Sequence, residues 1–77
     1  MRTEIKVKEI IKELSGETEI NLYDRLSDDI GLDSLAMVTL LIEVEEKFNI
    51  LLDETDMNPT LLSSVNDVVE MVRKYVE

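Results

Sequence analysis

The sequence predicts an all-α fold, a small bundle of three main helices plus one short helix, with a long ordered loop between the first and second. Two observations indicate this fold class. Apolar residues recur at helical spacing in three separate stretches, and a polar residue suited to an N-cap precedes each stretch. The chain has 77 residues, of which 44% are hydrophobic, so we expect residues 1–77 to fold as a single small domain.

The first helix is expected at residues 3–15. Thr3 is its candidate N-cap, and Ser15-Gly16 is its stop signal. Its buried face follows i, i+3, i+4, i+7 spacing and consists of Val7, Ile10, Ile11 and Leu14. The connection that follows, up to Asp33, is long for so small a domain. We expect it to be ordered, with a helical turn at Tyr23–Leu26, because apolar residues recur at every fourth position: Leu22, Leu26 and Ile30.

The second helix, expected at residues 34–48, carries two apolar stripes. The first is an ordinary core seam of Met37, Leu40, Leu41, Val44 and Phe48. The second is centred roughly 100° or more away and consists of Leu35, Val38 and Ile42. Periodicity leaves two interpretations of it open. The helix is either buried on two sides, or it presents the second stripe to a partner, with Glu45 and Glu46 at the edge of the contact.

After the second helix, Ile50-Leu51-Leu52 is expected to cross the core toward a polar stretch. A short helix is then expected to begin at either Thr55 or Pro59. Ser64 and Asp67 resemble a capping box for the last helix. Its expected buried face is Val65, Val68, Val69, Val72 and Val76. Since valine has a modest helix propensity, tertiary packing must hold this helix.

Asp33-Ser34-Leu35 lies where the acidic loop meets the second helix. Asp33 suits the N-cap, which places Ser34 at the first helical position. A phosphate on that hydroxyl would lie near the free N–H groups and the positive end of the helix dipole. Taken alone, however, the three residues favour an ordinary helix cap.

The chain contains no cysteine and no histidine. Disulfides, thiolate–zinc sites and a Ser-His hydrolase triad are therefore excluded. Because the usual base for a serine nucleophile is missing, Ser34 is better suited to be modified than to catalyse, and we expect neither a catalytic residue nor a metal site. The acids lack the Asp-x-Asp-x-Asp-Gly spacing of a calcium loop.

The net charge is −10, and residues 24–56 contribute ten acids and two bases, a net charge of −8 around Ser34. This charge argues against binding to nucleic acids or anionic membranes and favours basic partners. A solvated acidic surface that maintains solubility is the alternative. Because the sequence shows no membrane-spanning run and no secretory signal, the expected location is the cytoplasm. We also expect a monomer.

The run Asp28-Asp29-Ile30-Gly31-Leu32-Asp33-Ser34-Leu35, with Val38, Leu40, Glu45-Glu46 and Phe48 after it, resembles the acyl carrier proteins. The similarity extends across the chain. It implies that a phosphopantetheinyl transferase attaches 4'-phosphopantetheine from coenzyme A to Ser34, with Asp33 as part of the motif. The thiol of this arm would hold acyl groups as thioesters and deliver them to separate enzymes, so the chain itself would be no enzyme.

The resemblance also implies a docking surface for the transferase and for acyl-loading, condensing and modifying enzymes with basic surfaces. Apolar contacts would come from Leu35, Val38 and Ile42. Steering charge would come from Glu45, Glu46, Asp28 and Asp29.

Three positions depart from the carriers of fatty acid synthesis, which usually have acids where this chain has Ala36, Thr39 and Lys47. The sequence therefore favours a freestanding carrier of a dedicated pathway, such as polyketide synthesis, with fatty acid synthesis still open. An aminoacyl, peptidyl or D-alanyl carrier is the alternative. A more distant one is an acidic helical interaction module without a prosthetic group.

Overall fold

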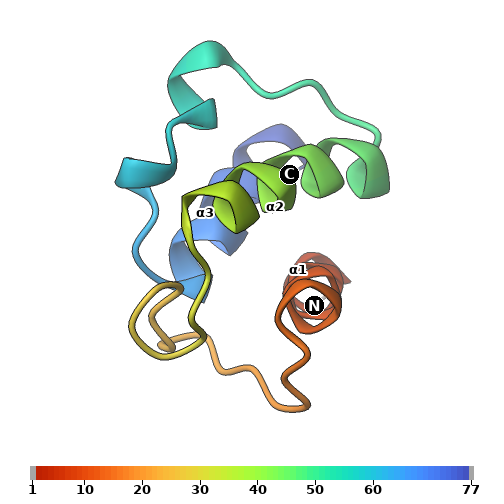
Figure 1. Cartoon of the computed structure of the whole chain (residues 1–77). Coiled ribbons are helices and arrows are strands. Elements are labelled where there is room, and N and C mark those ends of the chain that lie inside the picture. The colour runs from red at the N-terminus through yellow and green to blue at the C-terminus, as the bar shows by residue number, and fades with distance from the viewer. Residues whose placement is uncertain (1, 77) are drawn as a thin grey trace.

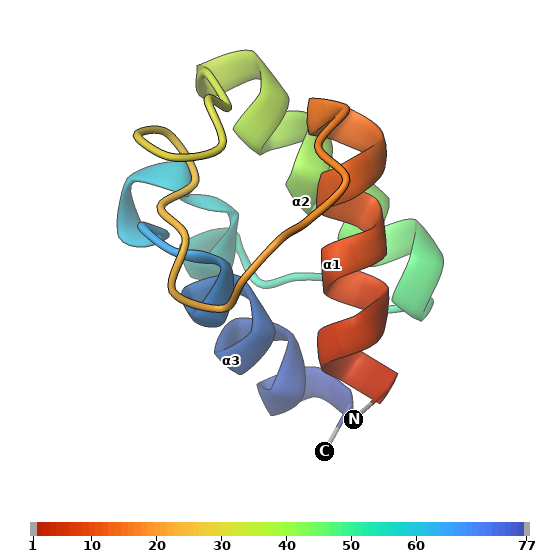
Figure 2. The same cartoon turned by 90° about the horizontal axis from the view of Figure 1, so that it is seen from below.

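The structure is a computed structural model that describes residues 2–76. It is a bundle of three α-helices, in which α1 packs against both α2 and α3 (Figures 1 and 2). Two 3-10 turns, η1 and η2, lie between α2 and α3. The elements in chain order are α1 (Arg2–Ser15), α2 (Ser34–Phe48), η1 (Glu54–Met57), η2 (Pro59–Leu61) and α3 (Val65–Val76). The predicted all-α class is confirmed, and within residues 2–76 the only β pairing is an isolated bridge between Arg25 and Ser64.

Helix α1 ends as predicted but begins one residue early. Gly16 has a positive φ of 78°, and its N–H donates to the Lys12 carbonyl at 2.9 Å, which closes the last turn. The prediction that Thr3 caps the helix is wrong. Thr3 lies inside α1 and is buried, because it shares the core-facing side of the helix with Val7 and Ile10.

The core fills the space between the three helices. The predicted seams of α1, α2 and α3 are buried in it, with Leu14 and Phe48 at its margin. The prediction that Val76 belongs to the buried face is wrong, since it is 40% exposed in the final turn of α3. The buried apolar residues are Val7, Ile10, Ile11, Ile20, Leu26, Leu32, Met37, Leu40, Leu41, Val44, Leu52, Val65, Val68, Val69, Met71 and Val72.

The loop between α1 and α2 is ordered, as predicted. Leu26 is fully buried, and Leu22 and Ile30 pack against the core beside it. The loop also buries Ile20 and Leu32, which the four-residue spacing does not identify. The helical turn lies later than predicted, at residues 26–29, because the Arg25 carbonyl accepts from the N–H groups of Asp29 and Ile30, both at 3.0 Å.

Backbone hydrogen bonds attach this loop to the start of α3. The Leu26 N–H donates to the Ser63 carbonyl at 2.9 Å, and the Asn66 N–H donates to the Leu22 carbonyl at 2.8 Å. The predicted capping box is confirmed, since Asp67 Oδ2 accepts from the Ser63 and Ser64 N–H groups at 2.9 and 3.1 Å. These two backbone donors lower the pKa of Asp67.

The connection from α2 to α3 runs partly over the core and partly outside it. Leu52 is buried as predicted, whereas Leu51 between its two apolar neighbours is 85% exposed. Both predicted starting regions form a short element, but each is a 3-10 turn rather than an α-helix. Few residues are available here, and 3-10 turns suit such short connections.

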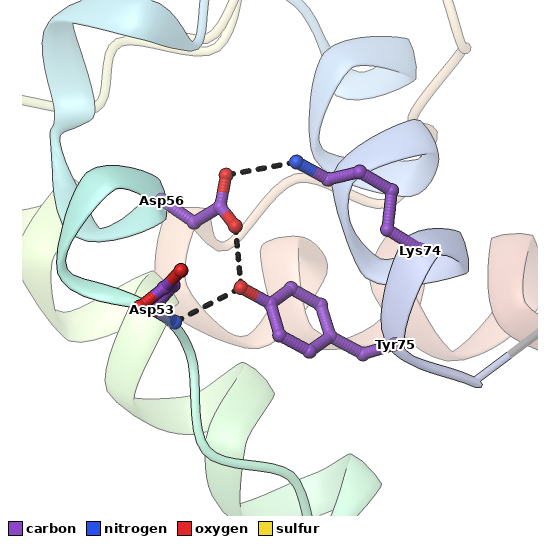
Figure 3. Close-up of polar contacts among 4 residues, drawn as sticks. All are labelled: Asp53, Asp56, Lys74 and Tyr75. Atoms are coloured by element: carbon purple, nitrogen blue, oxygen red, sulfur yellow. Dashed lines mark hydrogen bonds and ion pairs between the residues drawn. The ribbon is translucent and has the colours of Figure 1, made fainter.

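Four polar residues join η1 to the end of α3, and we call them the Tyr75 cluster: Asp53, Asp56, Lys74 and Tyr75 (Figure 3). The Tyr75 hydroxyl donates to Asp56 Oδ2 and accepts from the Asp53 N–H at 2.9 Å. Lys74 Nζ lies 3.0 Å from Asp56 Oδ1. The hydrogen bond from Tyr75, together with that from Lys74, lowers the pKa of Asp56, and the same carboxylate raises the pKa values of Tyr75 and Lys74.

We expect Asp56→Asn to lower the Tm at pH 7 by about 4–8 °C, because it removes the charged acceptor shared by Tyr75 and Lys74. Asp56 has a lowered pKa in the fold, so its contribution is present above its ordinary pKa of 3.8 and is lost as the pH falls below that value. Tyr75 and Lys74 have raised pKa values, so their contribution is fully present below their ordinary pKa values of 10.0 and 10.5 and is lost as the pH rises through the raised values.

Thermal unfolding of the wild type and of Asp56→Asn across pH 3 to 8 checks this prediction. The two Tm values should converge toward acidic pH. The matched control is Asp24→Asn, whose carboxylate accepts from the backbone N–H of Asn21 in the loop. A Tm difference for Asp56→Asn that is independent of pH would contradict the ionic role of the cluster.

Candidate functional site

The predicted N-cap fixes Ser34 at the start of α2. Asp33 has an extended backbone, and its Oδ1 accepts from the Ala36 N–H at 2.8 Å, so Ser34 is the first helical residue, as predicted. Just before it, Gly31 adopts a positive φ of 87°, which an L side chain rarely tolerates. Leu32 is buried, and its N–H donates to the Leu26 carbonyl at 2.8 Å. The segment leading to Ser34 is therefore held by packing, by a backbone hydrogen bond and by the cap, while Ser34 itself is exposed.

A groove of about 550 Å³ lies beside Ser34, and we call it the Ser34 groove. One wall is the loop before α2, and the other is the chain around η2. The groove is lined by Arg25, Leu26, Ser27, Asp28, Leu32, Asp33, Ser34, Met37, Thr60, Leu62 and Ser63. Sequence reasoning did not identify Arg25 or the residues of the η2 wall as part of the site, because no local pattern reports that these distant segments meet.

The second stripe of α2 lies on the surface. Leu35 is 76% exposed, Val38 39% and Ile42 45%, and we call these three residues the apolar strip. The opposite face of α2 supplies Met37, Leu40, Leu41 and Val44 to the core. Burial on two sides was one of the two predicted interpretations, and the structure excludes it, because the core covers the opposite face of α2 and leaves these three side chains exposed. Three large apolar side chains exposed on one helix are typical of a protein contact.

The four predicted steering acids have different environments. Glu46 and Asp28 are exposed, and Asp28 lines the Ser34 groove. Glu45 is half-buried, and its Oε2 accepts from the Leu52 N–H at 2.9 Å. Asp29 Oδ2 accepts from the Arg25 N–H at 2.8 Å. Glu45 and Asp29 therefore also hold the chain's own connections in place, a role that the sequence pattern did not reveal.

Two features that often mark a catalytic or metal site are missing from the part of the chain that the structure describes. The sequence has no histidine to activate Ser34. Within residues 2–76, no three acidic side chains converge in a way that could hold a metal ion. None of the helices in that range is long and apolar enough to cross a membrane. The site is thus an exposed hydroxyl at a fixed helix start, next to a groove and an exposed apolar strip.

Comparison with known proteins places this geometry in a family. Residues 6–72 match the family model described as "Phosphopantetheine attachment site". The chain is also 42% identical to an acyl carrier protein from Desulforapulum autotrophicum, over 96% of this chain and 97% of that protein. The chain belongs to the acyl carrier protein family.

Other acyl carrier proteins support the assignment over nearly the whole chain. The one from Clostridium acetobutylicum is 39% identical over 94% of each chain. A solved structure of a candidate acyl carrier protein from Mycobacterium tuberculosis superposes with a TM-score of 0.85, covering 95% of this chain and 97% of that one at 27% identity. The acyl carrier fold, with its long first loop, is therefore shared.

Acyl carrier proteins are carriers and not catalysts, and their cofactor is a covalently attached 4'-phosphopantetheine. This group supplies a thiol, which the cysteine-free chain lacks. The residues present fit such a group, because attachment needs an accessible hydroxyl and open space around it. Ser34 and the Ser34 groove offer both.

Proposed function

We propose that Ser34 carries the 4'-phosphopantetheine, attached by a phosphopantetheinyl transferase, and that the chain delivers thioester-bound acyl groups to separate enzymes. The observation that carries this proposal is the exposed Ser34 hydroxyl at the start of α2, inside the family match. A single monomeric domain in the cytoplasm is sufficient for such a shuttle.

The start of α2 suits a phosphodiester. Asp33 uses the N–H of Ala36, but the other N–H groups of the first turn have no partner within the helix. A phosphate on Ser34 would lie close to them and to the positive end of the helix dipole. Such an arrangement is worth about 0.3 to 1 kcal/mol at an exposed site.

The apolar strip is the proposed docking surface for partner enzymes, with Asp28, Asp29, Glu45 and Glu46 providing negative charge around it. Negative charge at the rim of a contact speeds the approach of a basic partner. A strip of three side chains supports only a small interface, and small interfaces are typical of transient complexes. A shuttle needs this property because each enzyme must release it.

We further propose that the carrier serves a dedicated pathway, such as polyketide synthesis, with general fatty acid synthesis still open. Three side chains make α2 less negative than in the carriers of fatty acid synthesis, which usually have acids at these positions. Ala36 packs against the core, Thr39 Oγ1 donates to the Leu35 carbonyl at 3.0 Å, and Lys47 lies 3.9 Å from Glu13 of α1. An aminoacyl or D-alanyl cargo is the alternative. Intact mass spectrometry of the protein from its native host distinguishes these cargoes by mass.

The proposed attachment is tested by incubating the chain with coenzyme A and a broad-specificity transferase. We expect a mass gain of one phosphopantetheine, and peptide mapping should place it on Ser34. A chain that stays unmodified with several transferases would favour an interaction module without a prosthetic group. Modification of a different hydroxyl would overturn the assignment of Ser34.

A further inference from the structure

Arg25 is the single basic residue between Lys12 and Lys47, and it lines the Ser34 groove. Its backbone is held firmly. The N–H donates to Asp29 Oδ2 at 2.8 Å, and the carbonyl accepts two backbone hydrogen bonds at 3.0 Å. Arg25 also forms the β-bridge with Ser64 at the start of α3. Arg25 is therefore an exposed residue whose backbone is fixed at the wall of the groove, within reach of the groove for its flexible side chain.

The guanidinium is not engaged by the chain's own acids. Within residues 2–76, the ion pairs involve Lys8, Lys47, Lys74 and Arg73 but not Arg25. This is unexpected, because residues 24–33 contain four acids. Three of these carboxylates accept backbone N–H groups: Asp24 takes that of Asn21, Asp29 that of Arg25, and Asp33 that of Ala36. The geometry of the loop thus leaves its only cation available for another anion.

A phosphodiester on Ser34 would be such an anion. The other charged residues that line the groove, Asp28 and Asp33, are both acidic, so a phosphodiester fixed there by its covalent bond is repelled by two carboxylates. Arg25 is the cation that lines the same groove, and a guanidinium can donate two parallel hydrogen bonds to phosphate oxygens. Lys47 cannot replace it, because it lies thirteen positions after Ser34 in α2, about 20 Å along the helix.

We propose that Arg25 binds the phosphodiester that joins the arm to Ser34. This inference rests on the proposed function, in which Ser34 is the attachment site. The contact directs the root of the arm into the Ser34 groove, whose lining includes no residue of the apolar strip. The arm and the docking surface then occupy different sides of the start of α2, so that a partner can bind the strip without displacing the arm.

The test compares the unloaded and loaded forms of the wild type, Arg25→Gln and Arg2→Gln. The last variant is the matched control, because it removes the same charge from an exposed site in α1. At low salt, we expect Arg25→Gln to reduce the difference in Tm between loaded and unloaded protein by about 1–4 °C, and about 1 M salt should abolish this effect. The ³¹P resonance of the loaded protein should shift in Arg25→Gln and not in Arg2→Gln.

Two more variants test whether the effect follows the charge near the phosphodiester. Asp28→Asn should change the Tm difference between loaded and unloaded protein in the opposite direction, because it removes a repulsion. Arg25→Lys should give a Tm difference between those of the wild type and Arg25→Gln, and it replaces Arg25→Gln in the test if that variant folds poorly. The inference is overturned if Arg25→Gln and Arg2→Gln behave alike in both measurements. Intact mass separates this failure from that of the proposed function. If the wild type is loaded on Ser34 and the Arg25 variants show no effect, only the inference is wrong.

Discussion

Replacing Ser34 with alanine should abolish loading of the phosphopantetheine arm and leave the fold intact, because Ser34 is the proposed attachment site. The expected loss is complete, because alanine has no hydroxyl to bond to phosphorus. Stability should change by less than about 0.5 kcal/mol, since Ser34 is exposed and the cap joins Asp33 to Ala36 without it. Intact mass after incubation with transferase and coenzyme A measures the loading, and thermal unfolding measures the stability.

Ser27→Ala is the matched control for this experiment. Ser27 is an exposed serine that lines the same groove, but it lies in the loop rather than at a helix start. We expect Ser27→Ala to load as the wild type does. If Ser34→Ala still gains the arm, the attachment site is elsewhere. If it unfolds instead, Ser34 has a structural role that its exposure does not reveal.

Two adjacent residues of α2 should respond to truncation in opposite ways. Leu41 is fully buried, so Leu41→Ala should cost about 2–5 kcal/mol through lost transfer energy and the cavity left behind. Ile42 is 45% exposed in the apolar strip, so Ile42→Ala should change stability by about 0.5 kcal/mol or less. A small domain has only about 5 kcal/mol or slightly more in total, so Leu41→Ala should leave a large unfolded fraction.

The same pair separates packing from docking. Ile42→Ala should lower kcat/KM for arm transfer severalfold, because the transferase loses an apolar contact in the proposed docking surface. Urea unfolding gives the stability, and initial loading rates at low carrier concentration give kcat/KM. If Ile42→Ala destabilises the chain as much as Leu41→Ala does, the strip is part of the core in solution. If loading is unchanged, the strip is not the transferase's contact.

The candidate site could be predicted in part from local signals. An Asp cap fixes the next residue as the first of a helix, because the capping hydrogen bond spans only three residues. The start of α2 at Ser34 and the capping box at Asp67 could be predicted for the same reason. Thr3 is a case in which the local signal gives the wrong position. It has the chemistry of a cap, but burial against the core decided its place inside α1.

The sequence by itself determined the three helices, the position of Ser34 and the existence of a second stripe on α2. These features depend on periodicity and on contacts between near neighbours along the chain. Only the tertiary structure decided that the stripe is exposed, that Arg25 and the η2 wall share a groove with Ser34, and that Asp56 binds Tyr75. The physical reason is that periodicity states which side chains share a face of a helix. Whether that face is buried depends on which distant segments pack against it.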